Sequence, residues 1–530
     1  MCGIAGAVGT EKCEKLLKSI MQEFEHRGEE NYRYETIKVD DKVSFGIHRL
    51  GIVDEHNGMQ PFTNGKLISI FNGEIYNHSD LKKLLSKDFN FKSNCDSETV
   101  LFSYKKWGND FVKYLDGMFA IAIFDTNEKT LIMARDPMGI KPLYYSSLDD
   151  GGFVFASEIK GLATITSVKE IKELSPGTIW NKNIEHKYFV LPPWRDYQGE
   201  NINLCLDMLE LFLRDSVRRH INIGEKKVAS LLSGGIDSSL ITYFAAQISP
   251  EVVAYTLASP NNTSNDLESA KVLCNQHNIN HIIVRPNEKD MKNFYLDKGV
   301  YMTESFDPVL VRNAVSYHFL CRQVVKDGFK YCLNGEGADE LFGGYDFINE
   351  VSFDLHDKLI WHSLSIIHNT YLQMADRASM FATLEARVPY MDVGFVKFAL
   401  SLPANLRLYE GLNKVALRKI ARNKLPDLIV DRRKVGMNEG SGYGKNLPTE
   451  SIYFEAVADF YKTNSFQYNK DLKIFDTYKQ DVTLDTANIE EVYNFARYVE
   501  CGYYKNKNGF KRLQLNTGVR KEVKEMLTVI

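Results

Sequence analysis

The cysteine at the second position of the chain is the first residue whose type and place could do chemistry. The small residue Gly3 beside it would let an aminopeptidase remove Met1, which would leave a free α-amino group on Cys2. An α-amino group titrates at about pH 7.7–8.0 and a free thiol at about 8.5. One residue would then supply both a nucleophile and the base that activates it.

Short motifs follow this cysteine along the first hundred residues. They are, in chain order, His26-Arg27-Gly28, His48-Arg49-Leu50, Asn72-Gly73-Glu74, and Asp96 within Cys95-Asp96-Ser97-Glu98. Taken singly, each has an ordinary explanation: Arg49 fits a surface ion pair, and Asn72-Gly73 fits a hairpin turn. The combination and its order carry more information than any one motif.

In this order the motifs resemble the class II glutamine amidotransferases, a branch of the N-terminal-nucleophile hydrolases. The resemblance implies that Cys2 attacks the side-chain amide of glutamine and releases ammonia. The substrate's α-carboxylate needs a cation, and Arg49 can offer a bidentate fork. Its α-ammonium group needs carboxylates, for which Glu74 and Asp96 qualify. In the family, an Asn-Gly pair forms the oxyanion hole, a role that falls here to Asn72 and Gly73.

One of these motifs departs from the family pattern. The family reads His-Arg-Gly-Pro-Asp where this chain has His26-Arg27-Gly28-Glu29-Glu30. Because that loop borders the glutamine pocket in the family, we expect its closure to differ here.

A second kind of chemistry is indicated by the segment Leu231–Ser239, which follows a predicted strand and opens a predicted helix. Its small residues let backbone N–H groups approach a phosphate, and the helix N-terminus adds a favourable dipole. The lysine of a Walker loop is missing. The segment resembles the Ser-Gly-Gly-x-Asp-Ser loop of ATP pyrophosphatases, which cleave ATP between the α and β phosphates. That resemblance assigns Mg²⁺ binding to Asp237.

Further strings extend the resemblance to the glutamine-hydrolysing asparagine synthetase family, over essentially the whole chain. They are Leu333–Glu340, Glu385-Ala386-Arg387-Val388-Pro389, and Lys434 within Arg432-Arg433-Lys434-Val435-Gly436. The resemblance implies that Glu336 assists attack on the acyl adenylate, that Asp339 binds metal with Asp237, and that Lys434 neutralises the departing phosphates. Arg432 and Arg433 stand beside Lys434 and are alternatives for that role.

The same resemblance defines a set of ATP-binding residues. They are Leu231, Ser233, Gly234, Gly235, Asp237, Ser238, Leu257, Asn334 and Gly335. Asn334 stands where the family has a serine. The expected cofactors are ATP and Mg²⁺, and the expected reaction converts glutamine, ATP and a carboxylate into glutamate, an amide, AMP and pyrophosphate.

The carboxylate that receives the ammonia is aspartate by family resemblance. Two segments differ from the family pattern, however: Thr303–Arg312 keeps Arg312 but has Val309 and Leu310 where threonines are common, and Gly436–Gly444 departs from the usual string. An acceptor such as a specialised metabolite or a sugar acid is therefore an alternative. A non-catalytic scaffold is a further alternative, against which the retained Cys2, Asp237, Glu336 and Asp339 argue.

The elements that must position these residues change character along the chain. Residues 1–190 contain short apolar or alternating runs separated by turn residues, which predict sheets with few helices. Leu191-Pro192-Pro193-Trp194 is the predicted linker. Beyond it, strands alternate with helices, which favours a parallel sheet, and after Leu341 the pattern is mostly helical.

We therefore expect two domains. Residues 1–190 are predicted to be a glutaminase with the α+β N-terminal-nucleophile sandwich, layered αββα. Residues 191–530 are predicted to be an α/β parallel-sheet ATP-pyrophosphatase domain with a helical C-terminal part, which adenylates and amidates. Because water would destroy an acyl adenylate, an apolar tunnel for ammonia between the domains is also expected.

Composition narrows the other possibilities. The 530 residues carry a formal net charge of -4, which does not indicate a basic surface for binding nucleic acid or an acidic membrane. The 8 cysteines lack zinc spacing. No membrane-length apolar run or secretory signal is present, so the cytoplasm is the expected location. The family suggests a homodimer.

Overall fold

The computed structural model describes most of the chain in two compact units. The described residues are 2–29, 35–40, 42–55, 57–193, 201–221, 226–260, 264–305, 307–345, 353–409, 412–443, 503–506 and 509–512. The first unit comprises Met1–Val190 together with Ser379–Glu385, and the second comprises Leu191–Ala378 and Ala386–Ile530. The domain boundary at residue 190 stays a prediction, to which the structure adds the short segment Ser379–Glu385.

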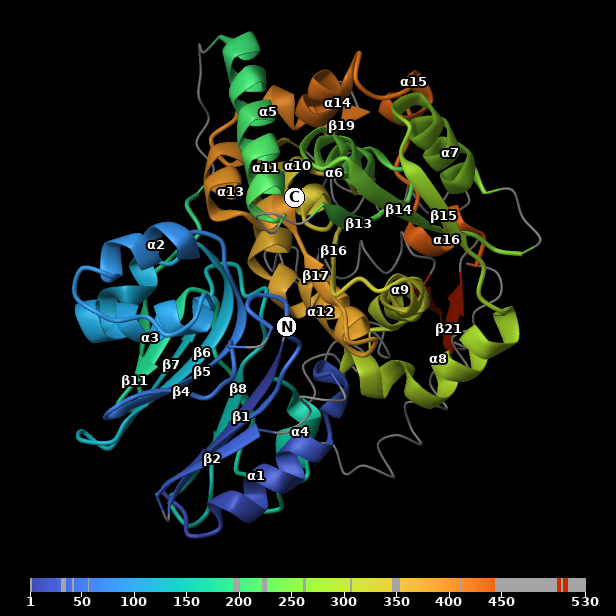
Figure 1. The fold of residues 1–530 in the computed structure, drawn as a ribbon. Helices are drawn as coiled ribbons and strands as arrows, with labels where there is room; N and C mark the ends of the chain where they lie inside the picture. The colour runs from blue at the N-terminus through green and yellow to red at the C-terminus, as the bar shows by residue number, and fades with distance from the viewer. Residues whose placement is uncertain are drawn as a thin grey trace. The chain divides into compact units, whose positions relative to one another are not determined.

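The first unit is built on two antiparallel six-stranded sheets (Figure 1). The first sheet has the strand order β10 (Lys172–Glu173), β8 (Tyr144–Ser147), β9 (Phe153–Ala156), β1 (Gly3–Val8), β3 (Val43–His48), β2 (Glu35–Asp40). The second has the order β12 (Ile184–Lys187), β11 (Thr178–Asn181), β7 (Thr130–Arg135), β6 (Gly117–Asp125), β5 (Leu67–Ile75), β4 (Phe62–Asn64).

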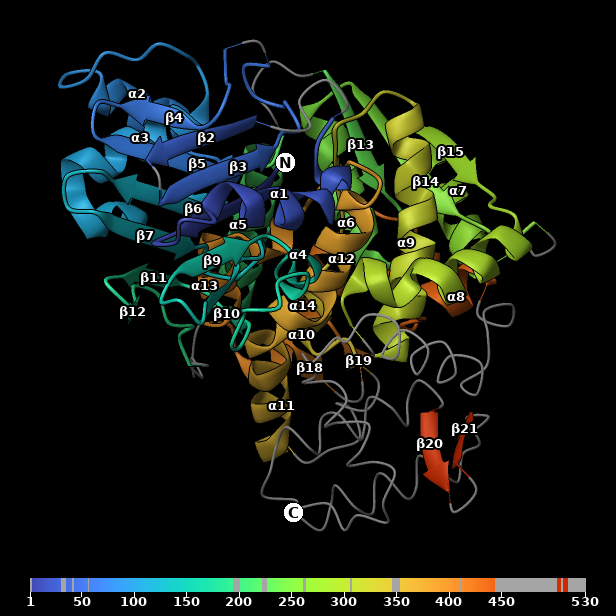
Figure 2. The ribbon, with the colours of Figure 1, turned by 90° about the horizontal axis from the view of Figure 1, so that it is seen from below.

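Helices cover the outer face of each sheet. Helices α1 (Cys13–Gln22) and α4 (Ile159–Ala163) lie against the first sheet, and α2 (His78–Leu85) and α3 (Asp96–Trp107) lie against the second (Figure 2). The layers are therefore helix, sheet, sheet, helix. This arrangement confirms the predicted αββα sandwich.

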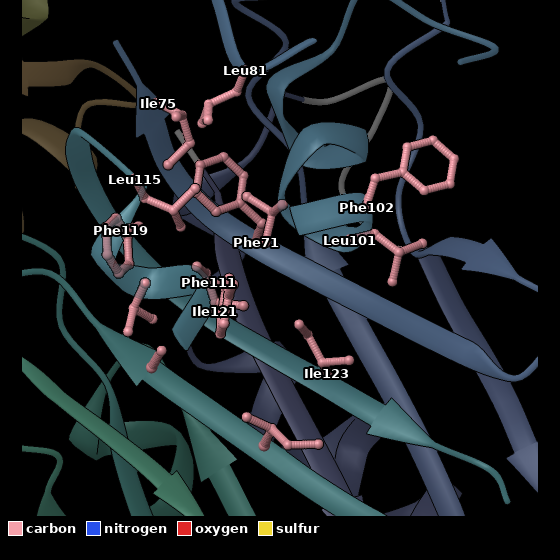
Figure 3. Close-up of a cluster of buried hydrophobic side chains, with 14 of the residues drawn as sticks. Phe71, Ile75, Leu81, Leu101, Phe102, Phe111, Leu115, Phe119, Ile121 and Ile123 are labelled. Atoms are coloured by element: carbon pink, nitrogen blue, oxygen red, sulfur yellow. The ribbon is translucent and has the colours of Figure 1, made fainter. Parts of the chain in front are cut away.

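Strand β6 shows why these residues form a middle layer. Side chains along a strand alternate between its two faces. Phe119, Ile121 and Ile123 belong to one buried cluster, which includes residues of α2 and α3, whereas Ala122 and Phe124 belong to a second cluster, which includes residues of the other sheet. Figure 3 shows the first cluster, in which residues of α3 meet residues of β5 and β6. The continuous apolar run of β6 therefore faces buried layers on both sides.

The second unit contains a five-stranded sheet in the order β15 (Asn280–Val284), β14 (Glu251–Leu257), β13 (Lys227–Leu231), β16 (Tyr331–Leu333), β17 (Glu385–Arg387). The register shows that β13 runs parallel to both β14 and β16. The chain order reverses between β13 and β16, and parallel sheets bind ligands at such a switch point, outside the carboxyl ends of the strands. The predicted parallel sheet is confirmed.

Helices make up most of the rest of the second unit over the residues that the structure describes. They are α5 (Ile202–Arg219), α6 (Ile236–Ile248), α7 (Asn265–His277), α8 (Glu288–Thr303), α9 (Pro308–Lys326), α10 (Ala338–Phe342), α11 (Phe353–Ser365), α12 (Tyr371–Met380), α13 (Val393–Ala399), α14 (Val415–Ala421), α15 (Asp427–Val430) and α16 (Met437–Ser441). Two hairpins complete the described part: β18 (Leu408–Tyr409) with β19 (Leu412–Asn413), and β20 (Tyr503–Asn506) with β21 (Gly509–Arg512). In this part of the chain no helix has the length and apolarity that a membrane span requires.

Candidate active sites

Cys2 lies directly before strand β1 and is buried, with 6% of its surface exposed. Its backbone N–H donates to Oδ1 of Asn72 at 3.1 Å. Asn72 sits within β5, not in a turn, so the hairpin-turn explanation of Asn72-Gly73 is wrong. The sandwich thus brings the predicted nucleophile and its predicted oxyanion partner together across 70 residues of sequence.

The other end of the Asn72 amide is a buried donor. Because Oδ1 faces Cys2, Nδ2 faces the opposite way, and within the described residues it has no hydrogen-bond partner. The next residue, Gly73, has φ +155°, and a Cβ there would lie 2.0 Å from the carbonyl oxygen of Met118. Only glycine fits this close approach of β5 to β6. An unused N–H donor on a residue that contacts the nucleophilic residue suits an oxyanion hole.

The environment of the thiol sets its reactivity. Burial raises the pKa of Cys2, and the chain's N-terminal ammonium, the backbone at Leu50 and the Arg49 guanidinium act in the opposite direction. The carboxylate of Glu385 adds to the rise. Cys2 is also tied at its carbonyl, which accepts from Nε of Arg27 at 3.1 Å. A positive charge close to the thiol favours the thiolate that attacks.

Arg49 is buried rather than at the surface, with 2% of its area exposed, which excludes the surface ion pair. Its guanidinium donates to the carbonyl oxygens of Glu55 at 2.7 Å and Asp54 at 3.1 Å. These two hydrogen bonds fix the plane of the Arg49 guanidinium group from one side. The side chain is thereby oriented before any substrate arrives.

The two predicted ammonium ligands lie beside the same strand. Asp96 begins helix α3, and its Oδ2 accepts from the backbone N–H of Ile75 at 3.0 Å. Burial raises the pKa of Asp96, and His78 counteracts that rise. Glu74 is the neighbour of Gly73 in β5 and is 8% exposed. The structure therefore gathers both carboxylates next to the strand that carries Asn72.

The departure at Glu29 has a structural counterpart. The backbone N–H of Glu29 donates to the carbonyl of Arg49 at 2.9 Å, and its Oε1 accepts from the N–H of Gly51 at 3.2 Å. Glu29 thus holds the backbone on both sides of Leu50. A proline at this position could make neither contact, because it has no N–H and no carboxylate.

The segment Ser379–Glu385 was not anticipated from the sequence as part of this unit. The ring of Phe381 lies 4.7 Å from that of His26, and Oγ1 of Thr383 donates to the His26 carbonyl at 2.8 Å. Glu385 is fully buried and acts electrostatically on Cys2 and Asp96. Because Thr383 and His26 are 357 positions apart, no local sequence signal could have indicated this contact.

In the second unit, the predicted phosphate loop follows β13 and leads into α6. Gly234 has φ +73°, and a Cβ there would lie 2.4 Å from the Asp266 carbonyl oxygen. Oγ of Ser238 accepts from the N–H of Ser233 at 3.1 Å, which closes the turn at the start of the helix. The loop lies at the switch point described above, where the fold favours an anion.

Asp237 and Asp339 are brought together by a lysine that the sequence motifs did not indicate. Nζ of Lys414 lies 2.5 Å from Oδ2 of Asp237 and 2.6 Å from Oδ1 of Asp339. Lys434 pairs with the other oxygen of Asp339. Burial alone would raise the pKa of Asp339, but the two lysines outweigh it and hold that pKa below its usual range.

The carboxylates suit a hard cation. Oδ1 of Asp237 is buried and makes no hydrogen bond to the described residues. Mg²⁺ takes one or two protein carboxylates and completes its shell with phosphate oxygens and water. No cluster of three or more His, Cys, Asp or Glu side chains able to hold a metal occurs in the described ranges. A metal here would therefore depend on the nucleotide for the rest of its ligands.

The arginines next to Lys434 differ in their surroundings. Arg432 pairs with Asp266 and donates to the Gly234 carbonyl, so it supports the phosphate loop from behind. Arg433 lines a cavity of about 50 Å³ next to the loop, together with Gly235 and Arg418. Lys434 contacts the predicted metal ligand Asp339. Lys434 also lines this cavity, as does Arg432, and its role at the phosphates stays a prediction.

A larger cavity of about 130 Å³ lies at the ends of β13, β14 and β16. Most of the predicted ATP-binding residues line it: Leu231, Ser233, Asp237, Ser238, Leu257, Asn334 and Gly335. Gly234 and Gly235 do not, although Gly235 lines the smaller cavity. Glu336 also lines the large cavity, where burial raises its pKa to about 8 and Glu340 adds to the effect.

The predicted acceptor segment lies at the start of α9. Asp307 caps this helix, and its Oδ1 accepts from the backbone N–H groups of Val309 and Leu310. Nη2 of Arg312 lies 3.8 Å from Oε1 of Glu439 on α16. Asn438 on α16 also bonds to side chains of α9. These contacts join the two segments that depart from the family pattern.

Two sheets of an N-terminal-nucleophile sandwich, joined to a parallel sheet with a phosphate loop at its switch point, define a glutamine amidotransferase coupled to an ATP-using ligase. Comparison with known proteins agrees: residues 1–183 match the glutamine amidotransferase domain family, and residues 208–358 and 350–464 match the asparagine synthase family. The chain belongs to the asparagine synthetase family. Its two domains imply glutamine and ATP as substrates.

Individual relatives cover nearly the whole chain. It is 29% identical over 489 residues to the glutamine-hydrolysing asparagine synthetase B of Escherichia coli strain K12, which covers 87% of this chain and 86% of that protein. It is 28% identical to the glutamine-hydrolysing asparagine synthetase of Cricetulus griseus, with 95% and 94% covered. The Homo sapiens asparagine synthetase is 28% identical, with 84% and 85% covered.

Proposed function

We propose that the protein is a glutamine-dependent asparagine synthetase. It would hydrolyse glutamine at Cys2, adenylate the side-chain carboxylate of aspartate with ATP, and transfer ammonia to give asparagine, AMP and pyrophosphate. The observation that supports it best is the cavity of about 130 Å³, in which the phosphate loop meets Glu336 and Lys434.

In the first unit, the thiolate of Cys2 attacks the amide carbon of glutamine. Negative charge then develops on the carbonyl oxygen, and the unused Nδ2–H of Asn72 and the N–H of Gly73 would stabilise it. The nitrogen takes up the proton that the thiol gave to the α-amino group of Cys2 and leaves as ammonia, and water then hydrolyses the glutamyl thioester to glutamate and free Cys2. Arg49 would hold the α-carboxylate, and Glu74 with Asp96 the α-ammonium group.

In the second unit, a carboxylate oxygen of the acceptor attacks the α-phosphorus of ATP, and pyrophosphate leaves. Lys434 and Lys414 would compensate the charge of the departing phosphates. Ammonia then attacks the acyl carbon, its proton passes to Glu336, and AMP leaves. A carboxylate with a pKa of about 8 is a stronger base than an ordinary glutamate, so it suits this proton transfer.

Mg²⁺ belongs to the same proposal. Asp237 and Asp339 would hold it, together with phosphate oxygens of ATP. The cation would supply charge neutralisation on the phosphates. A homodimer located in the cytoplasm is part of the proposal as well.

Cys2→Ala tests the first half of the reaction. We expect glutamate release from glutamine to be lost, while pyrophosphate release driven by added ammonia is kept. Loss of both activities in a well-folded variant would contradict the assignment of Cys2. No glutamate release from the wild-type protein, under conditions where ammonia supports synthesis, would contradict the glutaminase itself.

The acceptor requires its own experiment, because Val309 and Leu310 stand where the family has threonines. Pyrophosphate release is measured with ATP, Mg²⁺ and ammonia against a panel of carboxylates. We expect aspartate to stimulate it. If aspartate gives only the background rate while a specialised-metabolite or sugar acid stimulates release, the second candidate, amidation of that acid, is correct.

A further inference from the structure

The side-chain amide of Asn334 has a fixed orientation. Asn334 is 2% exposed, and the backbone N–H of Glu336 points at it from 2.9 Å. A backbone N–H can only donate, so the atom that faces it must be the amide oxygen. The nitrogen Nδ2 therefore faces the other way, toward the hydroxyl of Tyr317 at 2.8 Å.

This orientation decides what the Tyr317 hydroxyl can do. An amide N–H₂ only donates, so the phenolic oxygen must accept from Asn334. The hydrogen of the same hydroxyl then needs a different acceptor. Within the described part of the chain, the hydroxyl makes no hydrogen bond other than the one from Asn334, and Tyr317 is only 3% exposed. A buried donor without an acceptor is costly, which makes the site a place for a ligand.

Tyr317 and Asn334 both line the cavity of about 130 Å³. Tyr317 reaches it from α9, whereas Asn334 follows β16. One part of the lining is charged and holds Asp237 and Lys434, and another is apolar and holds Leu231 and Leu257. The Tyr317 residue, whose hydroxyl hydrogen lacks an acceptor, therefore lines the same cavity in which the adenylation is predicted to occur.

We propose that Tyr317 donates a hydrogen bond to an oxygen atom of the ligand bound in this cavity and so helps to determine its specificity. This inference rests on the proposed function, because the ligand is then ATP with its acyl acceptor. The oxygen is a sugar hydroxyl of the nucleotide or a carboxylate oxygen of the acceptor. A ligand that presented an amino or ammonium group at this point would meet a donor instead of an acceptor.

The tyrosine keeps its hydrogen throughout the ordinary pH range. Burial, followed by the nearby Cys332 and Cys321, raises the pKa of Tyr317 well above its usual value. The hydroxyl is therefore a neutral donor whose orientation comes from Asn334, not from its own titration.

Tyr317→Phe removes the hydroxyl and keeps the ring. The affinity for AMP is measured by isothermal titration calorimetry, and the Michaelis constants for ATP and for the acceptor by ammonia-driven pyrophosphate release. We expect a loss of about tenfold in the affinity for one of them, the size of one buried hydrogen bond. If the affinities for AMP and ATP change, the hydrogen bond from Tyr317 goes to a sugar hydroxyl of the nucleotide. If only the Michaelis constant for the acceptor changes, the hydrogen bond goes to the acceptor carboxylate.

Asn334→Asp tests the orientation. A carboxylate offers only acceptors, so Tyr317 would have to donate to the introduced carboxylate and would lose its hydrogen for the ligand. Adding Tyr317→Phe to Asn334→Asp is therefore expected to change the affinities less than about twofold further. An additive loss in the double variant would overturn the proposal.

Tyr255→Phe is the matched control. It removes a buried tyrosine hydroxyl from β14, one that donates to Asp327 at 2.9 Å and does not line the cavity. We expect it to leave all three affinities unchanged. The proposal is overturned if Tyr317→Phe lowers kcat without changing any of the three affinities. It is also overturned if Tyr317→Phe and Tyr255→Phe change these affinities to the same extent. Absence of pyrophosphate release from the wild-type protein with every acid would instead reject the proposed function.

Discussion

Lys414 lies between two carboxylates that would otherwise repel each other. It contacts Asp237 and Asp339 and is itself buried, with 2% of its side chain exposed. We expect Lys414→Met to lower kcat/KM for ATP by about 100-fold, because the positive charge proposed to compensate the departing phosphates is lost. The measurement is ammonia-driven pyrophosphate release.

The control for this variant lies on the helix that follows. Lys419 on α14 is exposed, so Lys419→Met removes the same charge without touching the carboxylates. We expect it to behave like the wild type, and both variants to keep glutaminase activity. Equal losses in the two variants would mean that only overall charge matters.

Glu336 has a consequence for stability. Its pKa of about 8 in the folded protein exceeds the value of about 4.3 expected in the unfolded chain. Between these values the folded state binds more protons than the unfolded state, so this group lowers stability as pH rises. We therefore expect Glu336→Gln, without nucleotide, to raise the melting temperature relative to wild type at about pH 8.5, with a smaller difference at about pH 5.5. A pH-independent difference would contradict the raised pKa.

Most of the candidate site residues could be recognised from local strings because short motifs place them on one loop or strand end. Asn72-Gly73 on β5 and Ser233–Ser238 after β13 are examples. Lys414 could not be recognised in this way. Its role comes from tertiary contacts with Asp237, 177 positions away, and nothing in its neighbours marks it.

Strand β6 carries the packing of the first unit on both faces. Ile121 is fully buried in the cluster of Figure 3. We expect Ile121→Ala to lower the free energy of unfolding of this unit by about 2–5 kcal/mol, since it removes buried methyl groups and leaves a cavity. Chemical denaturation measures it.

Ile184 on β12 is the control position for the loss of unfolding free energy in Ile121→Ala. It is 55% exposed, so Ile184→Ala is expected to change the free energy of unfolding by no more than about 0.5 kcal/mol. A similar loss at both positions would show that the alternation of faces along β6 does not determine stability.

Strand and helix positions were largely accessible from sequence periodicity. The apolar run Glu251–Leu257 forms β14, and the amphipathic segment Ile202–Arg219 forms α5. The β-like sequence pattern at residues 42–53 extends past the strand that forms there, because β3 ends at His48. Past that point the backbone bonds to Glu29 and to loop residues instead of to a neighbouring strand.

At the scale of the whole molecule, the first unit takes a segment from a distant part of the chain. Phe381 packs on His26, next to Arg27, which holds the Cys2 carbonyl. We expect Phe381→Ala to lower kcat/KM for glutamine by about tenfold, equivalent to about 1.4 kcal/mol, while ammonia-driven synthesis is kept. Glutamate release measures it, and an unchanged value would show that the segment does not position the thiol.

The membership of Ser379–Glu385 could not be derived from sequence for a physical reason. Its Thr383 has φ +60° and contacts a backbone carbonyl, so the interaction depends on the folded path and not on a side-chain pattern. Motifs report local chemistry, whereas this segment is defined only by long-range contact.

The lysines at Asp237 and Asp339 have a consequence for the order of binding. Lys414 and Lys434 act as built-in counter-ions, so the two carboxylates are already neutralised and do not need a free metal ion to hold their positions. In the proposed function, the phosphates of ATP would pair with Lys414 and Lys434, and Asp237 and Asp339 would then be free to hold the cation that is bound to the nucleotide. ATP and Mg²⁺ would accordingly bind together as a complex. Free Mg²⁺ that binds before ATP would have to compete with the two lysines for the carboxylates.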